Sequence, residues 1–261
     1  MGLAGCVEGI DAQRVVGYTL FKAGETALLT YPTPADDADL TGVSFHNGRF
    51  VQRLRFAAAG ARGVVLRQGT AKRLLSPTGG AWTDGAPVGG VAYRRAGEET
   101  DRAALGRLTV VCDGMYSSLR SSLTQPDIAA PSYFVGLLLS GAALPKERHA
   151  AVVLADAAPI LFYPISSTEV RCLVDVPGDK LPSASTGALG AHLASLAPQV
   201  PPSLRAPFLE AVAAGRFRSM QNKLLASTPL VVPGALLLGD SANMRCGRAP
   251  FVSILSAMPR F

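Results

Sequence analysis

The sequence contains few of the side chains that build metal centres and disulfide frameworks. Among 261 residues there are 4 cysteines and 3 histidines, and no two cysteines have the C-x-x-C spacing of a zinc or redox site. No secretory signal opens the chain. We therefore expect reduced cysteines, no metal site and a protein that faces the cytosol. The cysteines are Cys6, Cys112, Cys172 and Cys246.

Long hydrophobic runs and basic runs are also lacking. A membrane-spanning helix needs about 20 consecutive apolar residues, and the nearest segments, 135–144 and 230–238, are shorter and are predicted to be buried strands. The net charge of +6 arises from Lys and Arg scattered among Asp and Glu. This distribution argues against nucleic-acid binding.

The composition is that of a globular protein with a sizeable core, since 48% of the residues are hydrophobic. The 27 glycines and 19 prolines imply many turns and argue against a helical bundle. Periodicity predicts a mixed α/β fold, with an antiparallel sheet between residues 134 and 176. Further strands are expected at 15–21, 63–67, 70–75, 91–94, 108–112 and 235–238, and helices at 48–59, 117–123, 186–196 and 203–214.

Two of the apolar runs end in a carboxylate beside a glycine. One leads to Asp113-Gly114 and the other to Gly239-Asp240. Glycine lets backbone N–H groups approach a phosphate, and a carboxylate can accept a hydrogen bond from a ribitol or ribose hydroxyl. Either dipeptide alone is more simply a turn or a helix cap, but their occurrence in this order favours a nucleotide site.

Longer segments around these dipeptides resemble one family. The order of the two strand ends is similar to that of flavoprotein monooxygenases related to aromatic hydroxylases, and four segments narrow the resemblance to squalene epoxidase. The segments are V-E-G-I-D-A-Q at 7–13, S-F-H-N-G-R-F at 44–50, F-Y-P-I-S-S-T-E-V-R-C-L-V-D-V-P-G at 162–178 and G-D-S-A-N-M-R at 239–245. The resemblance runs from about residue 7 to residue 245.

The resemblance implies an incomplete FAD-dependent aromatic-hydroxylase-like fold with an antiparallel substrate-domain sheet. Residues 1–130 would form a partial FAD-binding domain interleaved with strands of the substrate domain, and residues 131–230 would form the substrate-binding domain. Residues 231–245 would return to the FAD-binding domain, and residues 246–261 would be a divergent tail. The turn G-x-G-x-x-G that opens a complete member is absent, as is the glycine-rich segment that follows G-D-S-A-N-M-R in the family. The chain is therefore expected to be a fragment without the N-terminal dinucleotide-binding unit and the C-terminal flavin and membrane segments.

Several residues take roles from the resemblance. It implies a catalytic role for Tyr18 beside the squalene pocket, where its phenol would orient a polar neighbour near the flavin; the alternative is a tyrosine at a strand end that only packs its ring. The resemblance assigns six residues to FAD and three to the wall of the substrate pocket. The FAD residues are Arg55, Val65, Asp113, Gly114, Gly239 and Asp240, and the pocket residues are Phe162, Tyr163 and Pro164. His46 is expected to be structural, and His149 and His192 are expected to be solvated.

The implied activity is oxygenation of squalene to (S)-2,3-epoxysqualene through an FAD C4a-hydroperoxide, in sterol and triterpenoid biosynthesis. Electrons would come from NADPH through a separate NADPH-cytochrome P-450 reductase. By the same resemblance the protein would act at the cytosolic face of the endoplasmic reticulum membrane. Two alternatives stay open: another FAD-dependent monooxygenase or reductase of the same fold, and a non-catalytic remnant or interaction module, because this shortened chain is expected to hold FAD poorly.

Overall fold

A computed structural model describes residues 2–32, 41–226 and 231–245. The chain forms two compact units, Met1–Val65 with Pro131–Gln221 and Leu66–Ala130 with Asn222–Phe261. Each unit therefore combines segments that lie far apart in the sequence. The expected functional division at residues 130 and 230 stays a prediction, and the tail at 246–261 lies outside the described residues.

The first unit is built on a seven-stranded sheet with the order β13-β9-β12-β11-β10-β2-β3. Strands β9 to β12 pair antiparallel, which confirms the sheet predicted between residues 134 and 176, whereas β10 and β2 run parallel. The strands are β2 Gly17–Lys22, β3 Glu25–Thr30, β9 Ile128–Ser140, β10 His149–Val153, β11 Ile160–Pro164, β12 Glu169–Pro177 and β13 Arg218–Leu225.

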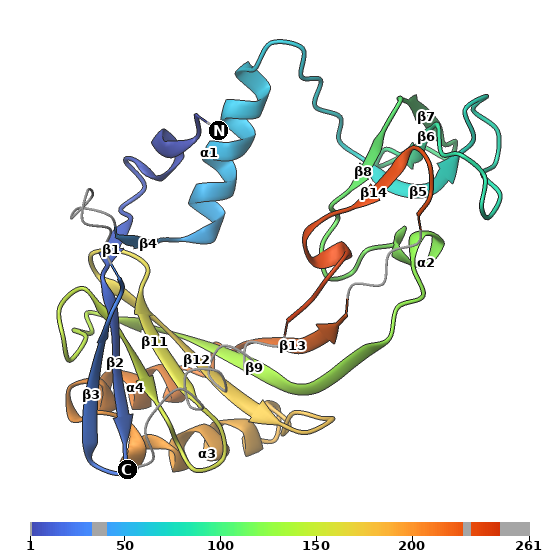
Figure 1. The fold of residues 1–261 in the computed structure, drawn as a ribbon. Helices are drawn as coiled ribbons and strands as arrows, with labels where there is room; N and C mark the ends of the chain where they lie inside the picture. Colours follow the sequence, from blue (N-terminus) through green and yellow to red (C-terminus); the bar gives the residue numbers. More distant parts are fainter. Residues whose placement is uncertain (1, 33–40, 227–230, 246–261) are drawn as a thin grey trace. The chain divides into compact units, whose positions relative to one another are not determined.

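Two helices, α3 Ala188–Ser195 and α4 Pro202–Ala213, cover one face of this sheet (Figure 1). Leu204, Phe208 and Val212 recur every four residues along α4, so they share one side of the helix and are all buried. Phe208 meets Phe162 of the sheet edge to face, with 6.3 Å between ring centroids. Alternation along each strand leaves the opposite set of side chains on the other face. The short helix η2 Ala197–Gln199 joins α3 to α4.

The N-terminal part of the first unit contains η1 Ala4–Val7, β1 Gln13–Val15, β4 Gly42–Ser44 and α1 Asn47–Gly60. The predicted helix at 48–59 is confirmed, but none of its residues is buried. The strand predicted at 63–67 is wrong. Gly63 has a positive φ of 80°, Val65 is 75% exposed, and the segment pairs with no described strand.

The second unit contains an antiparallel three-stranded sheet of β5 Thr70–Leu75, β6 Gly90–Arg94 and β7 Arg102–Leu105. A second sheet pairs β8 Thr109–Val111 with β14 Ala235–Leu237 in parallel. Two short helices, α2 Arg120–Leu123 and η3 Gly239–Ser241, follow these parallel strands. The core of the unit consists of Leu74, Val88, Val111, Leu119, Leu123, Val232 and Leu237, with Trp82 packed against it.

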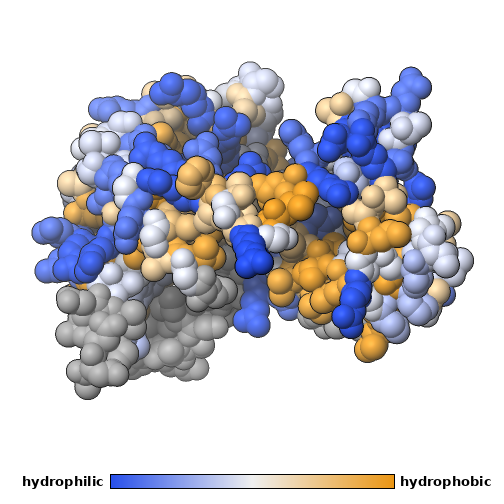
Figure 2. All heavy atoms as spheres, turned by 90° about the horizontal axis from the view of Figure 1, so that it is seen from above, coloured by the Kyte–Doolittle hydropathy of each residue, from blue (hydrophilic) through white to orange (hydrophobic). Residues whose placement is uncertain are grey.

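The exposed surface, the helix lengths and the clustering of possible metal ligands can be described for the same residues. Figure 2 shows exposed hydrophobic side chains in patches among hydrophilic ones. No helix in the described part of the chain is long and apolar enough to cross a membrane. Among the same residues, no group of three or more His, Cys, Asp or Glu side chains is placed to hold a metal ion.

Candidate cofactor and substrate sites

The two carboxylate-glycine turns meet at one edge of the second unit. Leu237 lies opposite Val111 in the parallel pair of β14 and β8, so both strands deliver their carboxyl ends to the same place. Gly114 and Gly239 have φ values of 81° and 68°, which a residue with a Cβ adopts only with strain. These glycines therefore let each strand turn sharply at its end.

A buried arginine joins the two turns. The Arg120 side chain donates hydrogen bonds to the carbonyl oxygens of Gly114 at 2.9 Å and Met115 at 3.1 Å. It also donates to the carbonyl oxygens of Asp240 at 2.9 Å and Ser241 at 2.8 Å. A guanidinium group has donors in a rigid fork that can serve several acceptors at once. Arg120 was not among the sequence-predicted site residues, because an arginine in a serine-rich segment resembles a solvated helix residue.

Ser241 provides a second connection between the strands. Its hydroxyl is fully buried and lies 2.6 Å from the carbonyl oxygen of Val111 and 2.7 Å from that of Leu238. The hydroxyl also accepts a hydrogen bond from the Leu238 backbone N–H at 3.2 Å. The end of β14 is thus tied to the end of β8 by a side chain as well as by the ladder.

The two aspartates differ in what their carboxylates do. The Asp113 carboxylate accepts a hydrogen bond from the Ser118 backbone N–H at 3.1 Å, which closes the turn after β8. The exposed Asp240 carboxylate accepts no hydrogen bond within the described residues. The Asp240 carboxylate is therefore available to a hydroxyl group of a ligand, and Gly114 and Gly239 have no side chain that would keep a ligand from the backbone.

The first unit carries a hollow of about 320 Å³ on the sheet face opposite α3 and α4. Tyr18 and Tyr163, both expected near the substrate, line it together with Tyr31. The rings of Tyr18 and Tyr31 meet edge to face at 5.5 Å. Burial, and then the neighbouring Tyr18 side chain, raises the pKa of Tyr31 above its usual range. The other lining residues are Val15, Gly42, Val43, Ser44, Ala150, Leu161 and Leu173.

The other two residues expected in the pocket wall lie elsewhere. Phe162 is fully buried in the core under α4 and therefore points away from the hollow. Pro164 lines a separate hollow with Arg148 and Glu169. Alternation explains this separation, because Leu161 and Tyr163 face one side of β11 and Phe162 faces the other.

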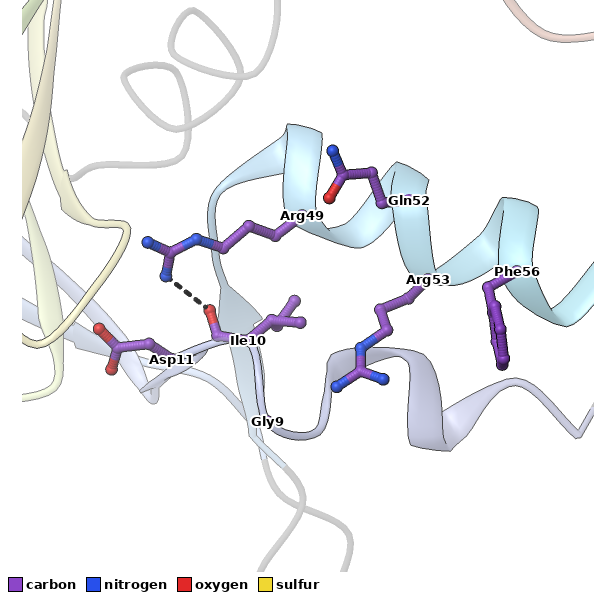
Figure 3. A pocket seen from close by; sticks show the side chains of 7 residues that line it. All are labelled: Gly9, Ile10, Asp11, Arg49, Gln52, Arg53 and Phe56. Atoms are coloured by element: carbon purple, nitrogen blue, oxygen red, sulfur yellow. Dashed lines mark hydrogen bonds between the residues drawn. The ribbon is translucent and has the colours of Figure 1, made fainter.

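The remaining predicted cofactor residues belong to the first unit. Arg55 is exposed on α1, and Val65 is exposed in the segment after it. On the η1 side of α1, Arg49, Gln52, Arg53 and Phe56 line a pocket, and Arg49 donates to the Ile10 carbonyl oxygen at 3.2 Å (Figure 3). Arg55 is two residues from Arg53 and so lies on a different side of the helix.

Polar contacts join three of the segments that resemble squalene epoxidase, those at 7–13, 44–50 and 162–178. The Asp11 carboxylate accepts hydrogen bonds from the Ser167 backbone N–H at 2.9 Å and hydroxyl at 3.0 Å. These bonds lower the pKa of Asp11. The His46 Nε2 atom lies 2.7 Å from a Glu169 carboxylate oxygen, which gives His46 the structural role expected of it.

The expectation that His149 is solvated is wrong. Its side chain is 7% exposed at the start of β10, and its Nδ1 atom lies 2.8 Å from the Glu147 carbonyl oxygen. The apolar neighbours in β10 place it inside the sheet. Cys6 and Cys172 are buried as free thiols, and Cys112 is a free thiol on the surface.

Comparison with known families decides the relationship. A model of the family described as "Squalene epoxidase" matches residues 105–251, more than half of the chain. The chain belongs to the squalene epoxidase family. The matched region includes the hollow-lining strands β11 and β12 and both carboxylate-glycine turns.

Individual relatives support the assignment to this family. The chain is 50% identical to squalene epoxidase 3 of Arabidopsis thaliana over 247 residues, which cover 94% of this chain and 45% of that protein. It is 48% identical to squalene monooxygenase SE2 of Panax ginseng over 246 residues, which cover 94% of this chain and 44% of that protein. The chain thus spans less than half the length of these relatives.

Solved structures show the fold. The flavin-dependent halogenase CmlS superposes with a TM-score of 0.72 at 13% identity, over 93% of this chain and 44% of its own. The probable FAD-dependent monooxygenase pqsL of Pseudomonas aeruginosa superposes with a TM-score of 0.69 at 16% identity, over 95% of this chain and 66% of its own. The expected similarity to flavin-dependent monooxygenases is therefore confirmed for the fold.

Proposed function

We propose that this chain provides the substrate sheet and one edge of the FAD site of a squalene-oxygenating flavoprotein. Family membership supports this proposal, and the observation that carries it is the junction in which Arg120 binds the carbonyl oxygens of both carboxylate-glycine turns. FAD supplies the oxygen-transferring chemistry when bound. The reaction converts squalene to its terminal epoxide, with NADPH as the electron source through a separate reductase at the endoplasmic reticulum membrane.

The protein's own task is to bind, orient and exclude water. Asp240 would accept a hydrogen bond from a hydroxyl of the cofactor, and Gly114 and Gly239 would let the backbone approach it. Arg120 fixes the distance between the two turns. In the first unit, Tyr18 and Tyr163 line a hollow whose other walls are largely aliphatic, and such walls suit a hydrocarbon substrate. Arg55 and Val65 are further proposed cofactor contacts.

The proposal is tested by titrating the purified chain with FAD and following the flavin absorbance. We expect saturable binding, and Asp240→Asn should weaken it by roughly 10-fold, because a hydrogen bond to a charged group contributes about 1.5–3 kcal/mol. Squalene conversion is then assayed with the reductase and NADPH. The matched control is Asp84→Asn, since Asp84 is an exposed aspartate in a loop of the same unit.

Two results would count against the proposal. One is the absence of saturable FAD binding by a folded chain at millimolar FAD. The other is equal FAD affinity in Asp240→Asn and Asp84→Asn, which would remove the Asp240 carboxylate from the cofactor site. Binding without epoxide formation would retain the cofactor site and reject independent activity of this chain.

A further inference from the structure

Helix α1 is not held in place by the hydrophobic core. None of its 14 residues is buried, and the contact between Phe50 and Phe45, whose ring centroids are 4.6 Å apart, lies within one short segment of the chain. The helix nevertheless carries Arg55, a proposed contact of the cofactor. Because burial does not fix the position of α1, polar contacts with the rest of the first unit have to fix it.

One such contact lies at the start of the helix. His46 is the N-cap residue of α1, and its side chain makes no capping hydrogen bond with the helix. Its Nε2 atom instead lies 2.7 Å from a carboxylate oxygen of Glu169, the first residue of β12. The first turn of α1 contains no acidic residue, so Glu169 brings to this end of the helix the negative charge that the helix dipole favours.

A second route joins the same turn of the sheet to the side of α1. Ser167 donates two hydrogen bonds to the Asp11 carboxylate, from its backbone N–H at 2.9 Å and from its hydroxyl at 3.0 Å. The residue before Asp11 then meets the helix, because Arg49 donates to the Ile10 carbonyl oxygen at 3.2 Å (Figure 3). The two routes start two residues apart, at the turn between β11 and β12, and both end on α1.

We propose that the turn between β11 and β12 is a positioning element for the cofactor: through Glu169 and Ser167 it sets where α1 lies, and α1 in turn sets where Arg55 lies. The inference rests on the proposed function only in its last step, the contact of Arg55 with FAD. The strands that this turn connects also line the hollow through Tyr163 and Leu173. One short turn therefore holds both a wall of the hollow and the helix that carries Arg55.

The expected effect is moderate because the contact is partly open to water. The side chains of His46 and Glu169 are 24% and 26% exposed, so water replaces part of the interaction when one partner is removed. The net value of one hydrogen bond predicts that its loss makes local opening of the helix about 3- to 10-fold more frequent.

Hydrogen exchange of the purified chain, followed by mass spectrometry from milliseconds to hours, tests the position of α1 without any ligand. Glu169→Ala should speed exchange in α1 by about 3- to 10-fold and leave the buried strand β10 unchanged. Glu169→Gln keeps an oxygen that can accept a hydrogen bond from His46, so its exchange should stay within about twofold of the wild type. Glu25→Ala is the matched control, because Glu25 is an exposed glutamate that also begins a strand of this sheet.

A second variant tests the other route. Asp11→Gly removes the carboxylate that Ser167 binds, and glycine suits the φ of 59° at this position. Exchange in α1 should again become about 3- to 10-fold faster while β10 is unchanged. This variant keeps the Glu169 contact, so it tests the positioning of α1 even where Glu169→Ala does not fold.

A titration with FAD tests the last step. Glu169→Ala should weaken FAD binding by about 2- to 5-fold in the otherwise unchanged chain. The same substitution should have no further effect when Arg55→Met is already present, because Glu169 acts through Arg55. A general loss of stability would weaken binding equally in both backgrounds, so this comparison separates positioning from stability.

The outcomes that would overturn the inference are distinct from those that would overturn the proposed function. Unchanged exchange of α1 in Glu169→Ala and Asp11→Gly would overturn the inference, as would faster exchange that spreads equally to β10. An effect of Glu169→Ala on FAD that persists beside Arg55→Met would remove Arg55 as the positioned group. If the folded chain binds no FAD, the proposed function and this last step fail together, and the exchange of α1 still decides whether the turn positions the helix.

Discussion

Replacing Arg120 by methionine should unfold the second unit far more readily than its position in a short helix suggests. The side chain is 5% exposed and serves four backbone carbonyl oxygens at 2.8–3.1 Å. A hydrogen bond from a charged donor contributes about 1.5–3 kcal/mol. Asp240 is exposed and Gly114 and Met115 are half-buried, so some of the four carbonyl oxygens regain water when the arginine is removed. We expect a net loss of about 3–5 kcal/mol in the free energy of unfolding.

The assay uses the single tryptophan of the chain as a reporter. Trp82 packs against the core of the second unit, and its indole N–H donates to the Ala86 carbonyl oxygen at 2.7 Å. Urea unfolding followed by Trp82 fluorescence therefore monitors this unit. Arg120→Lys should recover only part of the loss, because an ammonium group is a point charge that cannot reproduce the guanidinium fork.

Arg205 provides the matched control. It also donates to three backbone carbonyl oxygens, those of Ala197, Pro198 and Val200, but it is exposed in the first unit. Arg205→Met should cost less than about 1 kcal/mol, because Arg205 is an exposed residue whose guanidinium group also meets water, and most surface substitutions have small effects. If Arg120→Met shifted the Trp82 transition by no more than Arg205→Met does, the junction would not depend on the arginine and the reasoning would be refuted.

Three further changes test the core, one ionisable contact and one turn. Phe208→Ala should cost about 3–5 kcal/mol by circular dichroism in urea, whereas Leu209→Ala, at a 40% exposed position, should cost under about 1 kcal/mol. Hydrogen bonds from Ser167 lower the pKa of Asp11, so the ionised carboxylate stabilises the fold near neutral pH, and this stabilisation is lost as the pH falls through the lowered pKa. The difference in the free energy of unfolding between wild type and Asp11→Asn should therefore shrink between about pH 7 and pH 3. Gly234→Ala should lower the free energy of unfolding by about 3 kcal/mol or more, because φ is 81° and the new Cβ would lie 2.0 Å from a backbone carbonyl oxygen. A variant that unfolds at the wild-type temperature would contradict this predicted clash.

The sequence predicted the elements whose apolar residues recur with a clear period. The helices at 186–196 and 203–214 and the sheet between 134 and 176 were found because each buries one face in the common core. Four strands without that pattern were missed, β3, β4, β7 and β13. Most of their residues are exposed, so they are specified by backbone pairing with neighbours, which a local hydrophobic pattern does not encode.

The candidate sites, like the fold, could be predicted from the sequence only in part. Asp113 and Asp240 stood out because each ends an apolar run beside a glycine, but the sequence did not reveal that only Asp240 has a free carboxylate. Arg120 could have been suspected from Leu119 and Leu123, which flank it on a helix that must be partly buried. Which acceptors it reaches depends on the parallel pairing of two strands more than 120 residues apart, and that is a property of the fold.

The segments at 7–13, 44–50 and 162–178 have different roles around the hollow lined by Tyr18 and Tyr163. In the first unit the contacts of Asp11 with Ser167 and of His46 with Glu169 anchor the turn between β11 and β12. Neither contact lines the hollow, whose wall includes Tyr163 on β11. A strand that lines a largely aliphatic hollow offers few polar groups there, so its position must be fixed by polar contacts outside the hollow. The segment 162–178 therefore anchors the wall of the hollow through Ser167 and Glu169 and also forms part of that wall through Tyr163 and Leu173.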